Sequence, residues 1–387
     1  MDCQRTQSPG FSGPGFIRTA VIAVCWAGLV CLAVPAVAAG ASDIFTIRDV
    51  AVDVRATTAA AARRQAIAEG QRQALDRLLR RLVKKDDVAR LPLFDDSRVT
   101  ALVSGLEFSG EKSSAVRYLA ALTVRFDAEQ VRAVLRLTGI PFSETVSRKT
   151  LVVPLLEAAG VTRLWRPGNI WAQGWATVNH GTGLLPLVVA DGTPVDRGLV
   201  GFADVRGSDW DKLARLAKRY GASGVIIARA SLEYEPGGRT PVLRGRLLRP
   251  GAGQGAPPEF VFRGEDGETA AALITRAAHS LGGDLEEEWK SKTLIGYGIG
   301  GTVIARIPIS GLESWLQIAK ILKAIGSIRR LELDSLTTGE AVAAIHYIGD
   351  LGQLKIALAQ ADLRLKEAGD RYILVSAKPE GGDRSGS

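Results

Sequence analysis

The sequence predicts a mixed α/β (α+β) protein made of three small α/β units. Apolar residues at helical spacing over residues 58–83 and 209–220 alternate along the chain with short apolar segments such as 150–156. Helices that alternate with apolar strands indicate sheets covered by helices. The chain has 387 residues, of which 46% are hydrophobic, and about 100 to 200 residues usually form one domain. We therefore expect two or three packed cores.

The N-terminus predicts an exported protein. A weakly basic start and an apolar stretch from Ala20 to Val34 precede a run of small residues, which is the pattern of a secretory signal peptide. Cleavage after Ala38 and cleavage after Ala41 both satisfy the requirement for small side chains, and the first is preferred. We therefore assign residues 1–38 to a signal peptide and place the mature chain in the periplasm.

An inner-membrane anchor is the alternative for this segment, because residues 19–42 carry no charge and are long enough to cross a bilayer. All three cysteines, Cys3, Cys25 and Cys31, precede the cleavage site. The mature chain is therefore expected to hold no disulfide, thiolate metal site or cysteine nucleophile, and no cofactor is expected. With 49 basic and 41 acidic side chains, the whole chain carries a net charge of +8.

Residues 43–141 form the first expected unit. Its expected elements are a strand at 44–54, a helix at 58–83, a hairpin with strands at 99–109 and 115–126, and a short helix capped by Asp127. The long helix has one apolar face, and basic residues fill much of its remaining surface. The candidate interaction surface consists of Arg63, Arg64, Arg72, Arg77, Arg80, Arg81, Lys84 and Lys85.

This basic helix favours contact with anionic phospholipid, lipopolysaccharide or another acidic envelope component. The alternative is an ordinary solvated surface, since the apolar stripe is what a core-facing helix needs. Nucleic acid is not expected as a partner of an exported chain.

Residues 149–292 form the middle unit. Its expected strands are 150–156, 184–190, 224–230, 242–248 and 259–263, and its expected helices include 209–220 and 268–290. The candidate pocket consists of Trp171, Trp175 and His180, because aromatic rings stack on sugars or peptides; core packing of the tryptophans is the alternative. The run Glu286-Glu287-Glu288 predicts a solvated helix face, since consecutive helical residues point about 100° apart.

A Gly-rich linker at 293–301 leads to the third unit at 302–378. Its expected elements are strands at 303–309, 328–333, 340–347 and 372–377 and helices at 312–325 and 351–361. This order, β-α-β-β-α-β, is that of a ferredoxin-like fold. Residues 379–387 are polar and glycine-rich and predict a disordered tail.

Several motifs of packing type carry a resemblance to a known family. They are 62–71 with 74–82, 151–156, Asp209-Trp210 with 213–222, Trp289-Lys290, 309–312 with Trp315, and 346–350 with Leu354 and Leu358. On these residues the chain resembles the DUF2066 family, exported proteobacterial proteins of uncharacterised function. The middle unit is also similar to the N-terminal domain of TolB-like envelope proteins, and the first unit to part of certain flagellar basal-ring assembly proteins. These resemblances imply a scaffold or interaction module and identify no site.

We therefore expect a periplasmic, non-enzymatic protein that binds envelope proteins or anionic envelope components. The sequence has no G-x-S-x-G elbow, zinc-type histidine pair or phosphate-binding loop. One alternative is a hydrolase or transferase with a middle-unit site near Trp171, His180 and Asp191. The other is a peripheral binder of anionic lipid led by the basic helix at 63–85.

Overall fold

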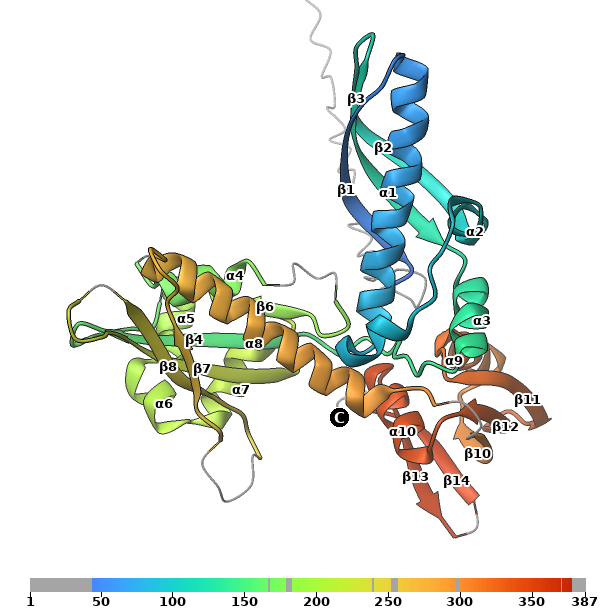
Figure 1. Cartoon of the computed structure of the whole chain (residues 1–387). Coiled ribbons are helices and arrows are strands. Elements are labelled where there is room, and N and C mark those ends of the chain that lie inside the picture. Colours follow the sequence, from blue (N-terminus) through green and yellow to red (C-terminus); the bar gives the residue numbers. More distant parts are fainter. Residues whose placement is uncertain are drawn as a thin grey trace, which may run out of the picture. The chain divides into compact units, whose positions relative to one another are not determined.

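The computed structural model describes residues 44–165, 168–178, 183–238, 240–251, 257–296, 300–369 and 371–377. The predicted signal peptide, its alternative as a membrane anchor and the predicted tail all lie outside these residues. Within them the chain forms three sheets, each packed against helices (Figure 1). The predicted mixed α/β class is confirmed.

The N-terminal region is an antiparallel sheet of order β1-β3-β2 covered by a long helix. Its elements are β1 (Thr46–Arg55), α1 (Ala59–Leu82), the 3-10 helix η1 (Lys85–Arg90), α2 (Asp96–Leu102), β2 (Val103–Ser113), β3 (Arg117–Phe126) and α3 (Ala128–Thr138). Thr58 caps α1, because its hydroxyl accepts a hydrogen bond from Ala61 N at 3.1 Å. Gly70 lets α1 approach the sheet closely, since a Cβ there would lie 2.3 Å from Leu122 Cδ1.

One prediction for this region was wrong. The segment from Val99 to Leu102 is the end of helix α2 and not the start of a strand. Asp95 begins this helix, as its carboxylate accepts a hydrogen bond from Arg98 N at 2.8 Å. Val99 and Leu102 are three residues apart, so both lie on one helix face, and both are buried. Helical spacing therefore fits these apolar residues better than strand alternation does.

The middle region has one mixed sheet with helices on both faces. Its elements are β4 (Thr150–Ala158), β5 (Val161–Arg163), α4 (Ile170–Ala176), β6 (Leu187–Val189), α5 (Pro194–Leu199), α6 (Phe202–Gly207), α7 (Trp210–Arg219), β7 (Gly224–Tyr234), β8 (Pro241–Leu248), β9 (Phe260–Arg263) and α8 (Ala270–Thr293). The main strand order is β5-β4-β7-β8-β9, and β6 pairs in parallel with the first part of β4.

Consecutive residues of β4 belong to two different cores. Leu151 and Val153 pack with side chains of α7, whereas Val152 packs with side chains of α4 and α8. On the second face, α4 and α8 approach each other closely at Gly174, where a Cβ would lie 3.0 Å from Ile274 Cγ2. A continuous apolar strand is what a sheet buried on both faces requires.

The C-terminal region contains β10 (Gly300–Pro308), α9 (Leu312–Ala324), β11 (Ile328–Leu336), β12 (Glu340–Ile348), α10 (Leu351–Gln360), β13 (Leu363–Ala368) and β14 (Arg371–Ser376). The predicted order is present with one additional strand, β13. The sheet order is β11-β12-β10-β14-β13. Because β13 and β14 form a hairpin, β14 runs parallel to β10, where a ferredoxin-like fold places an antiparallel strand. We did not predict β13 from the sequence, because this strand is short and half of its residues are charged.

A buried lysine fixes the end of α1 against α8. Lys290 is only 4% exposed, and its Nζ donates to Arg80 O at 2.7 Å, to Val83 O at 3.0 Å and to Glu287 Oε1 at 2.7 Å. Carbonyl groups at the C-terminal end of a helix have no N–H partner within that helix. Lys290 therefore caps α1 from α8, which also covers the middle sheet.

The segments that follow α3 and α8 add further contacts. Ser143 N donates to Leu82 O at 2.8 Å, and Ile295 N donates to Phe142 O at 2.7 Å. Arg148 N donates to Gln360 Oε1 at 2.8 Å, and the Arg148 guanidinium pairs with Asp362. Backbone hydrogen bonds and side-chain contacts therefore both hold these connecting segments in place.

Candidate functional site

Among the described residues, helices cover one face of the C-terminal sheet and leave the other uncovered. Along β10, Val303, Ala305 and Ile307 are buried with side chains of α9 and α10, and the residues between them are exposed. Paired residues of neighbouring strands lie on the same face of a sheet, so the exposed face of β10 continues over the other four strands. We call this surface the open face. It consists of Thr302, Ile304 and Arg306 of β10, Val342, Ala344 and His346 of β12, Arg330 and Glu332 of β11, Arg371, Ile373 and Val375 of β14, and Arg364 and Lys366 of β13.

The open face is apolar at its centre and basic at one border. Ile304 is 46% exposed at the centre, in β10. Arg364 and Lys366 are exposed on the edge strand β13, and Arg371 is exposed at the start of β14. Among the residues that the structure describes, no carboxylate contacts these three cations. The border therefore presents three positive charges that no carboxylate of the described residues pairs with.

A hydrogen-bonded series crosses three strands of the open face. Thr302 Oγ1 lies 2.9 Å from His346 Nδ1, and His346 Nε2 lies 2.9 Å from Glu332 Oε2. The hydrogen bond from His346 holds the pKa of Glu332 below its usual value. A hydroxyl, a base and a carboxylate in series also occur in hydrolases. Here the neighbouring backbone N–H groups belong to the sheet ladder, so they do not offer the donors that an oxyanion needs.

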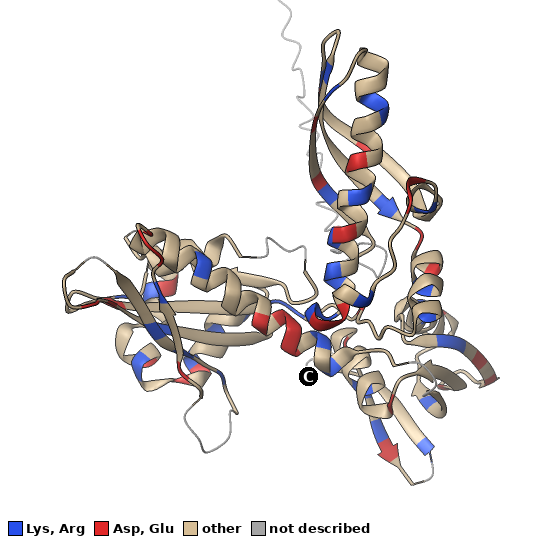
Figure 2. Ribbon diagram, viewed as in Figure 1, with Lys and Arg blue, Asp and Glu red and all other residues tan. Residues whose placement is uncertain are grey.

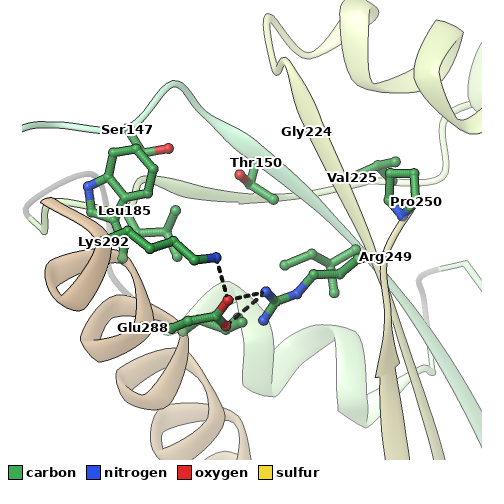
Figure 3. A pocket seen from close by; sticks show the side chains of 12 residues that line it. Ser147, Thr150, Leu185, Gly224, Val225, Arg249, Pro250, Glu288 and Lys292 are labelled. Atoms are coloured by element: carbon green, nitrogen blue, oxygen red, sulfur yellow. Dashed lines mark hydrogen bonds and ion pairs between the residues drawn. The ribbon is translucent and has the colours of Figure 1, made fainter. Parts of the chain in front are cut away.

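A pocket of about 280 Å³ lies beside the first residues of β4 and β7 and the last turns of α8 (Figure 3). It is lined by Ser147, Thr150, Leu185, Gly224, Val225, Ile226, Arg249, Pro250, Leu285, Glu288, Trp289 and Lys292. Most of these side chains are apolar. The charged residues form one group on one side of the pocket.

Glu288 binds two cations in this group. Arg249 Nη1 lies 3.0 Å from Glu288 Oε1 and 2.8 Å from Oε2, and Lys292 Nζ lies 2.6 Å from Oε1. Burial alone would raise the pKa of Glu288, but the hydrogen bonds from Lys292 and Arg249 outweigh this and lower it. The carboxylate is therefore ionised at neutral pH, and the group carries one positive charge in excess.

Internal partners occupy many basic residues of α1. Arg72 pairs with Asp96 at 2.6 Å, and Arg80 pairs with Asp76 at 2.8 Å. Arg81 Nη1 donates to Thr46 O at 3.2 Å and also to Ile44 O. Figure 2 shows acidic residues interspersed among the basic ones along this helix.

The other members of the predicted basic surface differ in their contacts. Arg63 lies over the Phe108 ring, with 5.0 Å between Cζ and the ring centroid, and 3.7 Å from Glu111. Arg77 donates to a backbone carbonyl. Arg64 and Lys85 are exposed, and Lys84 is half-buried. The surface is thus less basic than the sequence indicates, because the sequence does not show which carboxylates face the helix.

The two tryptophans of the predicted pocket are core residues. Trp171 is 0% exposed and Trp175 is 1% exposed, and their rings make an edge contact at 5.4 Å between centroids. Trp171 Nε1 donates to Ala228 O at 2.8 Å. Neither ring is accessible to a ligand, which corrects the prediction and favours its core-packing alternative. His180 lies outside the described residues.

Two residues of the enzyme alternative, Trp171 and Asp191, lie on different faces of the middle sheet. Trp171 packs on the face covered by α4 and α8. Asp191 follows β6, and its N–H donates to the Tyr220 hydroxyl beside α7 at 2.8 Å. Trp171 and Asp191 are therefore not brought together.

Hydrogen bonds around an ionised carboxylate tie α5 to the end of α7. Asp196 is fully buried and accepts hydrogen bonds from Tyr220 at 2.7 Å, Arg219 at 2.9 Å and Thr193 N at 2.8 Å. Burial opposes ionisation of Asp196, but these donors lower its pKa below the usual value. Burial, together with the hydrogen bond to Asp196, raises the pKa of Tyr220 to about 12. Ligands of open α/β sheets usually bind at this end of the parallel strands; here the polar groups satisfy one another.

The prediction of a solvated face for the glutamate run was wrong. Glu286 Oε1 accepts from Leu184 N at 2.9 Å. Glu287 accepts from Lys290 and from Lys85 N, and Glu288 binds the two cations of the pocket. Because successive residues point in different directions, each carboxylate meets a different part of the chain.

The described part of the chain contains neither a membrane-spanning helix nor a cluster of metal-binding side chains. No helix there combines the length and the apolar composition needed to span a membrane. No group of three His, Cys, Asp or Glu side chains there is placed to hold a metal ion.

Residues 47–144 match the family DUF8605, described as a domain of unknown function. The match covers β1 to α3 and supports an uncharacterised domain in that segment. A comparison with curated proteins found no match. The resemblance of nearly the whole mature chain to DUF2066 stays a prediction.

Sequence reasoning missed both the pocket and the open face. Arg249 and Glu288 are 39 positions apart, and their pairing depends on where β8 ends beside α8. The open face did have a local signal. In β10, Thr302, Ile304 and Arg306 alternate with smaller or apolar residues, which is typical of a strand covered on one side.

Proposed function

We propose that this chain is an exported periplasmic protein of the DUF2066 type that works without catalysis, as a scaffold or interaction module of the cell envelope. Its partner-binding surface is the open face. The partner is an envelope protein segment that presents apolar residues flanked by acidic ones. The observation that carries the proposal is the apolar centre of the open face beside three cations that no described carboxylate contacts.

The apolar centre supports binding because an exposed Ile304 gains free energy when another surface covers it. Burial of apolar area contributes about 25 cal/mol per Å². A partner that covers Ile304 adds this burial to what the side chain already contributes to the strand.

The basic border supports an acidic partner. Arg364, Lys366 and Arg371 extend from neighbouring strands, so their charges act together on an approaching chain. Such an arrangement mainly speeds association and selects the partner by charge.

The test is site-specific photo-crosslinking in intact cells. A benzophenone amino acid replaces Ile304 in one strain and Gln317 in a matched control, since Gln317 is exposed on α9, on the covered side of the same sheet. We expect a defined envelope protein to be captured from position 304 only. The same products from both positions would contradict the proposal.

A charge-reversed variant tests the chemistry of the partner. Arg364→Glu with Lys366→Glu should abolish capture from position 304 while circular dichroism stays unchanged, because both side chains are exposed. Undiminished capture would contradict an acidic partner.

The location has its own test. We expect the protein recovered from a periplasmic fraction to have the intact mass of a chain that begins at Ala39. A chain that retains residues 1–38 and stays with the inner membrane would favour the anchor alternative.

A further inference from the structure

We propose that the pocket beside β4, β7 and α8 binds a small amphipathic anion, a carboxylate attached to a single apolar chain. The apolar chain lies against the walls of the pocket, and the carboxylate binds Arg249 and Lys292. This inference is independent of the open face and of any protein partner.

The walls suit an apolar chain. Leu185, Val225, Ile226 and Leu285 line the pocket together with the Trp289 ring. Trp289 is held in place because its Nε1 donates to Thr145 O at 2.6 Å. Small-molecule sites are lined mainly by such side chains with a few polar groups, and their volumes run from about 300 to 1,000 Å³. A volume of about 280 Å³ therefore selects a small ligand.

The charged group selects an anion. Arg249 contacts Glu288 through Nη1 alone. Within the described residues, no acceptor contacts its Nε or Nη2, and these two nitrogens present parallel N–H groups that fit the two oxygens of a carboxylate. The anion also balances the excess positive charge that Glu288 leaves.

Other head groups fit less well. An ammonium group would be repelled by Arg249 and Lys292. The carboxylate of the charged group, Glu288, already pairs with both of these cations. A neutral hydroxyl offers one oxygen instead of two, so it cannot form the bidentate pair that an arginine makes with a carboxylate. It also carries no charge to balance the excess positive charge of the group.

A polar group on the opposite side of the pocket helps to orient the ligand. Thr150 and Gly224 begin two neighbouring parallel strands, and a Cβ on Gly224 would lie 3.2 Å from Thr150 Oγ1. The absence of a side chain at Gly224 keeps this hydroxyl uncovered beside the pocket, where it offers both a donor and an acceptor.

The experiment measures binding of three eight-carbon probes to the purified mature chain by calorimetry: octanoate, octanol and octylamine. We expect octanoate to bind at least about tenfold more tightly than the other two, as one charge-assisted pair predicts. Tighter binding of octylamine, or no binding of octanoate at millimolar concentration, would overturn the proposal.

Matched variants locate the site. Arg249→Gln should weaken octanoate binding about tenfold or more. The control is Arg246→Gln, because Arg246 is exposed on β8, just before Arg249, and does not line the pocket. It should change the affinity less than about twofold. If Arg249→Gln unfolds the chain, Lys292→Gln supplies the same test, because Lys292 is 56% exposed. Equal affinities for the pocket variants and Arg246→Gln would place the ligand elsewhere and overturn the proposal.

Discussion

The middle and C-terminal sheets differ in how many faces are covered. In β4 of the middle sheet, the residues from Leu151 to Val153 are all 0% exposed, because helices pack on both faces. In β10 of the C-terminal sheet, Ala305 is 0% exposed but its neighbour Ile304 is 46% exposed. A sheet covered twice leaves room for a ligand beyond the ends of its strands, and the pocket lies there, beside the first residues of β4 and β7. A sheet covered once offers a whole face to a macromolecular partner.

The largest expected effect compares one substitution in the two sheets. Ile227→Asp places a carboxylate in the core between β7 and α7, where Ile227 is 0% exposed. We expect it to lower the free energy of unfolding by more than about 4 kcal/mol or to prevent folding. Ile304→Asp on the open face should cost less than about 1 kcal/mol. Urea unfolding of both variants measures the two free energies. Similar losses would mean that Ile304 is buried in the folded chain and that the open face is not open.

A second contrast lies along α8. Lys290→Met removes the donor to Glu287 Oε1 and to the carbonyl groups at the end of α1, and we expect a loss of about 3 kcal/mol. Lys292→Met removes an exposed ion pair and should cost no more than about 1 kcal/mol. Urea unfolding midpoints measure both, and equal effects would show that the buried lysine does not cap α1.

The smallest expected effect is a pH dependence in the middle region. The folded-state pKa of Asp196 is lowered, so its contribution to stability is fully present above the unfolded pKa of about 3.9. That contribution is lost as the pH falls through the folded value. Asp196→Asn should therefore be less stable than the parent at pH 7 and lose less stability between pH 5 and pH 3. A parallel loss in both proteins would assign the acid sensitivity to other carboxylates.

The sequence predicted the difference between the sheets in part. The run Leu151 to Leu156 is apolar without interruption, which is typical of a strand buried on both faces, whereas Thr302 to Ile307 mixes polar and apolar residues. The helices α1, α7 and α8 were also predicted close to their observed positions, because their apolar residues recur at helical spacing. The short helices α5 and α6 were missed, although Thr193 and Asp196 form a capping box.

The candidate sites were harder to predict because side chains meet across long sequence separations. Trp171 and Trp175 have the same spacing whether they bind a ligand or fill a core, and only the packing of α4 against α8 decides between the two. The three glutamates of α8 have identical chemistry. Their roles differ because Leu184, Lys290 and Arg249 reach them from different directions.

The central claim is that the open face is covered by a partner in the cell. Cysteine accessibility tests it directly, since the described residues contain no cysteine and the parent chain gives the background. Ile304→Cys and, as control, Gln317→Cys are reacted with a membrane-impermeant maleimide in purified protein and in cells with a permeabilised outer membrane. We predict equal labelling when purified and selective protection of position 304 in cells. Equal labelling of both positions in cells would contradict the account.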